Sequence, residues 1–507
     1  KTSSDASILN ALLDVEAGNT VSFKGLSGMN AERAYDLDKR TYDESMVNVL
    51  GLSTGFAGNV GVNRQTTIDM NIEGTRGYIK PGTKDSDVGL KSLCMTEAIT
   101  PYSTNHDDPF RSAMTFVQTS KHFMRTKVMN PRLISNGADE ALPYLASNTF
   151  AYKSKKPGVI KEKTDDHIIL EYTDGSFDYI NLDPKIIKNS SGGFFGSLTL
   201  ESDLNEGSKF KAGDIIAYDK SSFDGSVGAT NNLAYNAGTL VKMAIMYTDE
   251  GIEDSGIITE WMSEALASDV IIKSEVNLSA STNVYDMVKV GQHVEEGDAL
   301  ITFQDATDDE DINNLMKALG ADEDEISDLG RRFKRSKYTG EVVDIKIYRT
   351  AETTELSDSL KKIVTKHEKK IIDKKGSMKK YNIDQEYILD STGVLEPTGK
   401  LKNTPDGVLI EFYVKFTDKF KIGDKDVLDA ALKNVIKDII PKGEEPYSEF
   451  RPNEEVSTLG ALNSIEGRMV GSISNNGCLN KILIELDRSV KEILGIPWKT
   501  IQEMSEK

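Results

Sequence analysis

Apolar and polar residues alternate along VIKEKTDDHIILEYTDGSFDYI, the segment that spans residues 159–180. A period of two places alternate side chains on opposite faces of a β-strand. The pairs Asp165–Asp166 and Asp174–Gly175 interrupt this alternation, as residues at turns do. The pattern therefore predicts a meander of short antiparallel strands between residues 151 and 200.

A Gly-Asp pair recurs beside strand-like stretches, in GSKFKAGD, GQHVEEGD and FKIGD. The three pairs occupy residues 213–214, 297–298 and 423–424. Glycine adopts positive φ without a steric penalty, so each pair predicts a tight turn. Such turns recur in small barrel and sandwich-hybrid folds, and we interpret them as a feature of the fold.

Helical spacing is less frequent than strand alternation. Helices are predicted at residues 257–267, 311–320, 356–370, 426–440 and 480–507. A chain of 507 residues is too long for one hydrophobic core. We therefore expect a β-rich, multi-domain protein of the α+β class.

The chain carries 81 acidic and 61 basic residues, a net charge of -20, which argues against a protein that simply coats nucleic acid. The charges are unevenly distributed, however. Acidic residues gather at 305–328, and basic residues gather at 331–337 and 361–380. Each of these charged runs could also be an ordinary surface segment that is exposed to solvent.

The two cysteines, Cys94 and Cys478, lie far apart in the sequence. This spacing excludes a disulfide framework and a paired-cysteine zinc site, so no zinc is expected, and a reducing cytoplasm fits. No apolar run approaches the about 20 residues that cross a bilayer, so we expect no membrane association.

Four sequence blocks carry residues suited to phosphate chemistry. The blocks are ITPYSTNHDDPFRSAMTFVQTSKHFM (99–124), GTLVKMAIMYTDEGIEDSGIITE (238–260), DGVLIEFYVKFTDKFKIGDK (406–425) with Lys433, and SIEGRMVG (464–471). In this order they resemble the C-terminal portion of the β subunit of multisubunit DNA-directed RNA polymerases, over about residues 51–474. Short motifs such as HDD or GDK arise by chance, but four in the same order are specific.

The resemblance implies a double-psi β-barrel with inserted barrel-sandwich hybrid and flap domains. The expected regions are a fork- or lobe-proximal region (1–98), the start of the β core (99–147), the barrel-sandwich hybrid domain (148–224), the first segment of the double-psi barrel (225–260), the flap (261–405) with a tip helix near 311–320, the second segment of the double-psi barrel (406–475) and C-terminal helices (476–507).

Nucleotidyl transfer accumulates charge on phosphate oxygens, so catalysis rests on positioning and electrostatics, usually with two Mg²⁺ ions. By resemblance, Arg111 and Arg468 would contact the β- and γ-phosphates of the incoming nucleotide, a task that suits the planar guanidinium fork. Lys425 and Lys433 would hold the RNA 3′ end. The eight-residue spacing between these lysines matches the family pattern.

By the same resemblance, Glu253 and Asp254 would lie near the second Mg²⁺ and reach it indirectly through water. The sequence contains no Asp-x-Asp-x-Asp cluster for the first Mg²⁺. In the family that principal site belongs to the β′ subunit, so this chain would be active only in complex with a β′-like chain.

Each of these residues also has an ordinary structural interpretation. Glu253 and Asp254 fit a polar turn or a helix cap, and the two lysines fit a solvated face. The two arginines fit an ion pair of Arg111 with Asp107 or Asp108 and a surface position of Arg468.

The predicted flap-tip helix presents a small apolar face on an acidic stretch, formed by Leu315, Ala318 and Leu319. Partner-binding helices have this pattern, so we expect a promoter-specificity or σ-like factor to dock there. An ordinary local core contact explains the same face.

The sequence departs from the family at residues 51–63 and in DVLDAAL, which stands between the two lysines in place of an Arg-His-Gly-rich turn. A glycine-poor helix is predicted at that point. By the same resemblance, we expect a subunit without the family's lobe and C-terminal clamp segment, similar to the split, divergent subunits of large bacteriophages.

We therefore expect a β C-terminal half that works in the bacterial host cytoplasm with template DNA, RNA and NTPs. A β N-terminal-half chain and β′-like chains would complete the enzyme. The alternative is a non-catalytic polymerase-like scaffold or phage structural protein.

Overall fold

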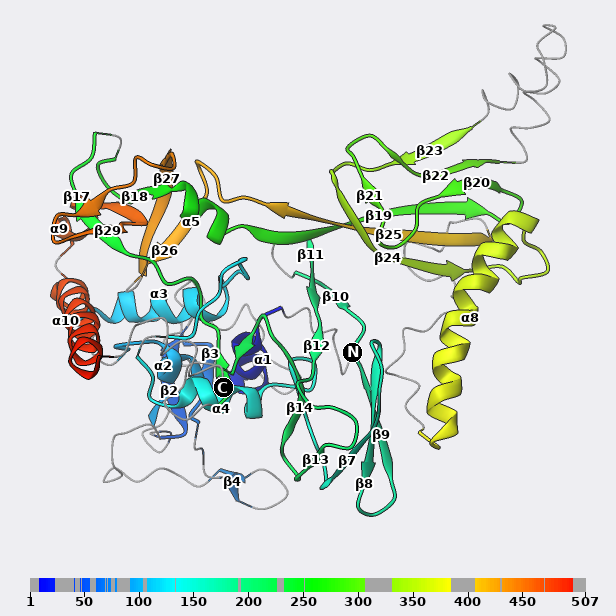
Figure 1. Cartoon of the computed structure of the whole chain (residues 1–507), viewed down its shortest axis with the longest axis horizontal. Coiled ribbons are helices and arrows are strands. Elements are labelled where there is room, and N and C mark those ends of the chain that lie inside the picture. The colour runs from blue at the N-terminus through cyan, green and yellow to red at the C-terminus, as the bar shows by residue number, and fades with distance from the viewer. Residues whose placement is uncertain are drawn as a thin grey trace, which may run out of the picture.

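The computed structural model forms a multi-domain, strand-rich α+β structure, so the predicted fold class is confirmed at this level (Figure 1). It describes residues 9–22, 41, 46, 48–54, 61–68, 70, 72–73, 78–79, 92–103, 107–132, 134–189, 193–225, 232–249, 251–305, 331–383, 406–428, 431–468 and 470–495. The predicted tip helix at 311–320 lies outside the described residues.

The N-terminal region of the described chain packs four helices beside a small antiparallel sheet. The helices are α1 (Ala11–Gly18), α2 (Met95–Ile99), α3 (Pro109–Ser120) and α4 (Ala138–Leu145). The sheet has the order β1-β3-β2, from β1 (Thr20–Ser22), β2 (Leu50–Thr54) and β3 (Asn63–Thr66). A shared core that includes Leu12, Ile99 and Leu142 joins α1, α2 and α4.

The predicted meander is confirmed as two antiparallel sheets over one apolar core. One has the order β13-β7-β8-β9, from β7 (Gly158–Lys163), β8 (His167–Tyr172), β9 (Phe177–Asn181) and β13 (Lys209–Phe210). The other has the order β12-β14-β6, from β6 (Ala151–Lys153), β12 (Leu200–Glu201) and β14 (Ile215–Asp219). Ile160, Ile168 and Leu170 are at most 1% exposed and fill the space between them.

The three Gly-Asp pairs form the same turn, as predicted. Gly213, Gly297 and Gly423 have φ values of 87°, 94° and 92°. In each turn the following aspartate accepts the backbone N–H of the residue three positions earlier, at 2.7–2.8 Å. Positive φ at the glycine and this side-chain cap explain why the dipeptide recurs at strand ends.

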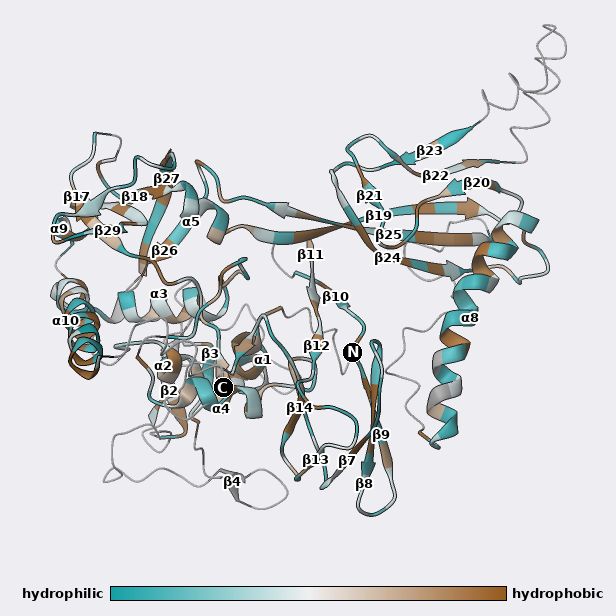
Figure 2. Ribbon diagram, viewed as in Figure 1, coloured by the Kyte–Doolittle hydropathy of each residue, from teal (hydrophilic) through white to brown (hydrophobic). Residues whose placement is uncertain are grey.

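A long antiparallel ribbon carries the chain away from these domains. Its strands β19 (Ser268–Ser279) and β25 (Gly407–Asp418) pair over all twelve residues of each strand. They belong to a sheet of order β10-β11-β19-β25-β24-β21, with β10 (Lys185–Lys188), β11 (Phe195–Leu198), β21 (His293–Val294) and β24 (Gly340–Arg349). Brown, apolar residues gather on β24 and β25 at the far end of the ribbon (Figure 2).

A second sheet and a long helix pack at the far end of this ribbon. The sheet has the order β20-β22-β23, from β20 (Asn283–Met287), β22 (Ala299–Gln304) and β23 (Arg332–Arg335). The helix α8 (Asp358–Lys380) covers most of the helix predicted at 356–370. Leu360 and Val364 of α8 join the same core as Phe412 of β25.

The sheet that carries the predicted site has the order β17-β30-β18-β27-β26. Its strands are β17 (Met243–Met246), β18 (Ser255–Thr259), β26 (Lys425–Leu428), β27 (Leu432–Ile440) and β30 (Thr458–Ala461). Strand β18 runs parallel to β27 and antiparallel to β30, and β26 runs antiparallel to β27. Strands of sequence block two and the hairpin that carries Lys425 and Lys433 therefore meet in one mixed sheet, and block four begins three residues after β30.

One predicted helix is wrong in this sheet, and another is shorter than predicted. Residues 426–440 form the hairpin of β26 and β27, because LKNVIKDII alternates buried and exposed residues at its start. Residues 257–267 divide into β18 and the short helix α5 (Glu260–Ala265). Thr259 ends the strand and caps α5, since its hydroxyl accepts the N–H of Met262 at 3.3 Å.

The remaining elements are short, apart from the last helix. They are β4 (Ile72–Glu73), β5 (Tyr78–Ile79), β15 (Phe223–Asp224), β16 (Ala234–Tyr235), β28 (Tyr447–Ser448), β29 (Arg451–Glu455), α9 (Asn463–Glu466) and α10 (Gly471–Leu494). The C-terminal helix thus begins nine residues before the predicted start at Asn480. Among the described helices, none is long and apolar enough to span a membrane.

Gly407 tests the close approach of β19 and β25. A Cβ there would lie 1.9 Å from the backbone oxygen of Leu278, so Gly407→Ala forces the ribbon apart. We expect a lower melting temperature, with a loss of about 1–3 kcal/mol in unfolding free energy. Gly376→Ala in α8 is the control, because no heavy atom lies within 4 Å of its Cβ. Equal melting temperatures for Gly407→Ala and the parent would contradict this prediction.

Candidate functional site

The β26–β27 hairpin brings the two predicted lysines onto one face. Lys425 pairs with Val435, and Lys433 pairs with Val427, so all four side chains lie on the same side of the hairpin. Both lysines are exposed and occupy diagonal positions, for which Cα atoms lie about 7–8 Å apart. The hairpin therefore presents two ammonium groups together to solvent.

The acidic turn lies beside this hairpin. The carbonyl of Asp254 accepts the N–H of Val435 at 2.9 Å, and Val435 in turn pairs with Lys425. Adjacent strands are about 4.8 Å apart, so the backbones of Asp254 and Lys425 are separated by roughly 10 Å. Glu253 and Asp254 thus form a polar turn that precedes β18, one of the two structural alternatives proposed from the sequence.

Arg468 binds the carboxylate of this turn. Its Nη2 donates to both Oδ1 and Oδ2 of Asp254 at 2.7 Å, while Oε1 of Glu253 lies 3.9 Å away. Its Nη1 donates to the carbonyl of Ser464 at 2.5 Å. The Ser464 hydroxyl accepts the N–H of Asp254 at 2.8 Å, which supports the positive φ of 49° at that residue. The second and fourth blocks are therefore locked together.

Arg111 approaches the same place from helix α3. It is 8% exposed, and its Nη1 donates to the carbonyl of Ala431 at 3.1 Å. Burial lowers the pKa of Arg111, and the neighbouring charge of Arg468 lowers it further, whereas Asp108 and Asp254 raise it. The two arginines are therefore close enough to repel each other and share the field of one carboxylate.

The contact with Ala431 also explains how Lys433 is positioned. Ala431 adopts a left-handed φ of 58° immediately before β27 begins. A non-glycine residue is uncommon in this region, and here the arginine hydrogen bond fixes its carbonyl. The helix predicted between the lysines is wrong, and the two strands keep both lysines on one surface.

Asp107 has a different role from the ion pair considered for it. Its carboxylate accepts the backbone N–H groups of Gly471 and Ser472, at 2.9 and 3.3 Å, and the Ser472 hydroxyl at 2.8 Å. These hydrogen bonds, with that of the Ser472 side chain the largest cause, lower the pKa of Asp107. An anion at the first turn of α10 also interacts favourably with the helix dipole. Asp107 thus joins the first block to the fourth.

The carboxylates of this site do not form a metal centre by themselves. Both oxygens of Asp254 already accept bonds from Arg468, which leaves Glu253 as the less engaged carboxylate of the turn. Within the described ranges, no group of three or more His, Cys, Asp or Glu residues could hold a metal ion. The exposed Lys425 and Lys433 and the partly exposed Arg468 are cations that suit the binding of phosphate oxygens.

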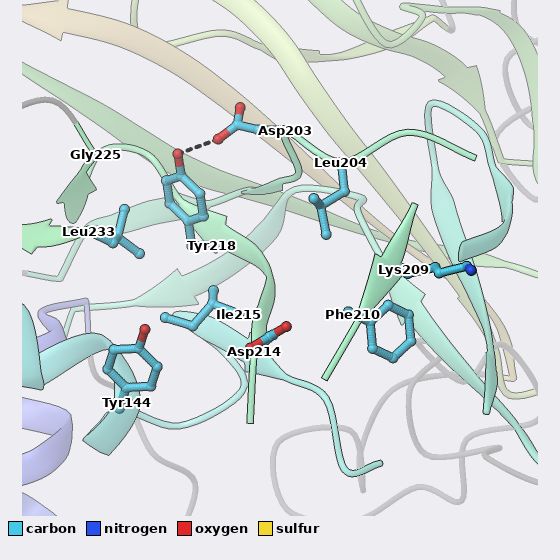
Figure 3. Close-up of a pocket in the computed structure, with 10 residues that line it drawn as sticks. All are labelled: Tyr144, Asp203, Leu204, Lys209, Phe210, Asp214, Ile215, Tyr218, Gly225 and Leu233. Carbon is cyan, nitrogen blue, oxygen red and sulfur yellow. Dashed lines mark hydrogen bonds between the residues drawn. The ribbon is translucent and has the colours of Figure 1, made fainter. Parts of the chain in front are cut away.

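A cavity elsewhere contains none of the six predicted residues. It has a volume of about 370 Å³ and lies against β13 and β14 (Figure 3). It is lined by Tyr144, Asp203, Leu204, Lys209, Phe210, Asp214, Ile215, Tyr218, Gly225 and Leu233. The hydroxyl of Tyr218 donates to Asp203 at 2.6 Å across one side of it. This cavity is therefore separate from the candidate site.

Sequence reasoning missed a buried polar pair beneath the lysines. Asp426 and Asn434 face each other on the inner side of the hairpin, and they are 9% and 2% exposed. Neither Asp426 oxygen nor the Asn434 amide nitrogen has a hydrogen-bond partner among the described residues. Burial raises the pKa of Asp426 to about 6, and the adjacent Asn434 only partly opposes this. The alternation of apolar and polar residues in LKNVIKDII could have indicated a strand here, with Asn434 on its inner face.

Asp426→Asn tests the cost of this buried carboxyl group. The folded pKa of about 6 exceeds the unfolded value of about 3.9, so stability is lost as pH rises from 4 through 6. We expect the variant to gain on the order of 2 kcal/mol at pH 8 and to match the parent near pH 4. Thermal melting across this pH range measures the difference in stability between variant and parent. A gain that is independent of pH would contradict the raised pKa of Asp426.

Comparison with known proteins adds no family to these observations. No protein-family model matches the chain, and no curated protein matches it. The residues of the four blocks and the geometry that joins them are therefore the features that bear on function.

Proposed function

We propose that this chain is the C-terminal half of a β-type subunit of a DNA-dependent RNA polymerase and that it binds the substrates of nucleotidyl transfer. The convergence of the four blocks is the main support. Asp107 and Arg111 of block one contact block four and the hairpin of block three, while Asp254 of block two binds Arg468. Four segments that are spread between positions 107 and 472 of the sequence thereby meet at one site.

In this proposal, Lys425 and Lys433 hold phosphates at the RNA 3′ end. Their ammonium groups are exposed on one face, and each would act as a point charge toward a non-bridging oxygen. Arg468, at 24% side-chain exposure, would exchange some of its contact with Asp254 for the triphosphate. Arg111 would act mainly by orienting the hairpin, since its guanidinium is buried on Ala431.

The Mg²⁺ ions of the proposed reaction would be held principally by carboxylates of a β′-like partner chain. Glu253 and Asp254 would lie near the nucleotide-associated ion without supplying its main ligands. The β-rich sheet of order β17-β30-β18-β27-β26 is compatible with the proposed double-psi barrel, of which blocks two and three would form the halves. The flap-tip site for a σ-like factor remains a prediction on residues outside the described ranges.

One observation favours the second candidate, a non-catalytic polymerase-like scaffold in a bacterial host cytoplasm. Arg111 and Arg468 both bind atoms of this chain, so their contacts already have a structural purpose. The exposed lysines distinguish the candidates, because within the described residues neither ammonium group has a side-chain hydrogen bond or ion pair that would give it a structural purpose.

The double variant Lys425→Ala/Lys433→Ala tests this function in the assembled complex. Loss of two charged phosphate contacts, each worth about 1.5–3 kcal/mol, should reduce RNA extension on a primed template at least 100-fold. Assembly should be intact, because both side chains are exposed. The control Lys419→Ala/Lys421→Ala removes two nearby lysines that pair with Glu264 and Asp418. Normal extension by the first variant would refute the site.

Helix α10 supports the proposal that further chains join this one. Its apolar side chains at i, i+3, i+4 and i+7 spacing face outward, and several are 58–83% exposed: Ile482, Leu486, Ile493 and Leu494. Its inward face is charged instead, since Glu485 binds Arg451 and Arg488 binds Glu454. Brown residues are visible along the helix (Figure 2). An outward apolar stripe beside the candidate site suits a partner helix.

Ile482→Asp/Leu486→Asp tests this surface. A buried carboxylate is costly in a helix–helix interface, so the variant should lose co-purification with the proposed β′-like chain. Ser474→Asp adds a charge to an exposed position near the start of α10 and should retain the complex. Undiminished co-purification of the double variant would exclude α10 from the interface.

A further inference from the structure

Helix α8 concentrates positive charge in a strongly acidic chain. Its 23 residues include nine lysines, against the acidic Asp358, Glu368 and Asp373, whereas the whole chain has a net charge of -20. With a rise of about 1.5 Å per residue, the helix is roughly 35 Å long. Figure 1 shows it projecting from the sheets at the far end of the ribbon, along the edge of the molecule.

The helix is anchored at both ends, so its charges are held in fixed positions. Ser357 caps its start, and Leu360 and Val364 are buried against the sheet that contains β24 and β25. At its other end, Met378 packs with Ile169 and Tyr179 of the meander. A helix fixed in this way presents a rigid surface instead of a flexible basic tail.

The lysines between these anchors line the solvent side. Lys362, Lys366 and Lys369 are exposed at i, i+4 and i+7, opposite the buried positions 360, 364 and 378. Glu368 lies to one side of this row and binds Nε of Arg349 at 2.8 Å. The exposed Asp358 and Asp373 lie one turn beyond the two ends of the row, at i-4 to Lys362 and i+4 to Lys369. Lys366 therefore has lysine neighbours at i-4 and i+3, and like charges at these spacings oppose the helix. A polyanion would relieve that repulsion.

We propose that the exposed face of α8 binds the phosphate backbone of nucleic acid. Lysines along one helix face neutralise successive phosphates without reading bases, so binding is expected to be independent of sequence and sensitive to salt. The exposed stretch contains one prominent apolar side chain, Ile372, at 64% exposure. A nucleic-acid backbone therefore fits this face better than a membrane surface, which rewards an apolar stripe.

This inference goes beyond the proposed function. It depends on α8 alone, on a surface formed by residues other than Lys425 and Lys433, and requires no nucleotide or partner chain. A failure of RNA extension would leave it intact, and a failure of binding at α8 would leave the proposed site intact.

The test compares Lys362→Gln/Lys366→Gln/Lys369→Gln with the parent chain, using fluorescence anisotropy. The probes are a labelled DNA duplex of about 20 base pairs and an RNA of about 20 nucleotides, from about 50 to 200 mM salt. The control Lys156→Gln/Lys161→Gln/Lys220→Gln removes three lysines that pair with Asp174, Glu171 and Glu201. Glutamine has nearly the helix propensity of lysine, so α8 is retained, which circular dichroism verifies.

We expect the α8 variant to lose at least tenfold in affinity. For DNA, the slope of log K against log salt concentration should fall in magnitude by about 2–3, because each lost phosphate contact contributes about 0.9 to it. The control should match the parent. The relative loss with the duplex and with RNA identifies which nucleic acid is bound. Equal affinity and slope for parent and α8 variant would overturn the proposal, as would binding of anionic lipid vesicles with no binding of either nucleic acid.

Discussion

The contact between Arg468 and Asp254 joins segments 214 residues apart, and the arrangement of the candidate site depends on it. Asp254 holds Arg468 with its carboxylate and β27 with its backbone carbonyl, so one residue connects the fourth block to the hairpin. Arg111 completes the arrangement by binding the hairpin at Ala431. Electrostatic repulsion between the two arginines is tolerated because both also feel the opposite charge of Asp254.

Local patterns predicted the strand-rich regions well. The meander and the three Gly-Asp turns follow from alternation and from the backbone freedom of glycine, which act within a few residues. The six candidate site residues follow only from resemblance and order, and their roles stay predictions. Their convergence could not be derived from the sequence, because it results from pairings such as Val435 with Asp254 that span almost two hundred residues.

The errors have a common physical origin. Residues 426–440 contain good helix formers, yet β18 and β26 supply neighbours on both sides of β27, and tertiary pairing overrides local propensity. The same pairing buries Asp426 with Asn434, a cost that no local pattern reveals. Asp107 was considered as a partner for Arg111, but a helix N-terminus with unsatisfied N–H groups binds it instead.

The twelve-residue ribbon of β19 and β25 has a mechanical consequence. Strand β19 follows β18 through α5, and β25 continues through the Gly423 turn into β26, so both strands connect to the site sheet from the same end of the ribbon, where Ser268 pairs with Asp418. A tilt of the ribbon would move the acidic turn and Lys425 in the same direction. Through the paired strands of the ribbon, a displacement of α8 and the sheets around it would therefore reach the opposite charges at the other end.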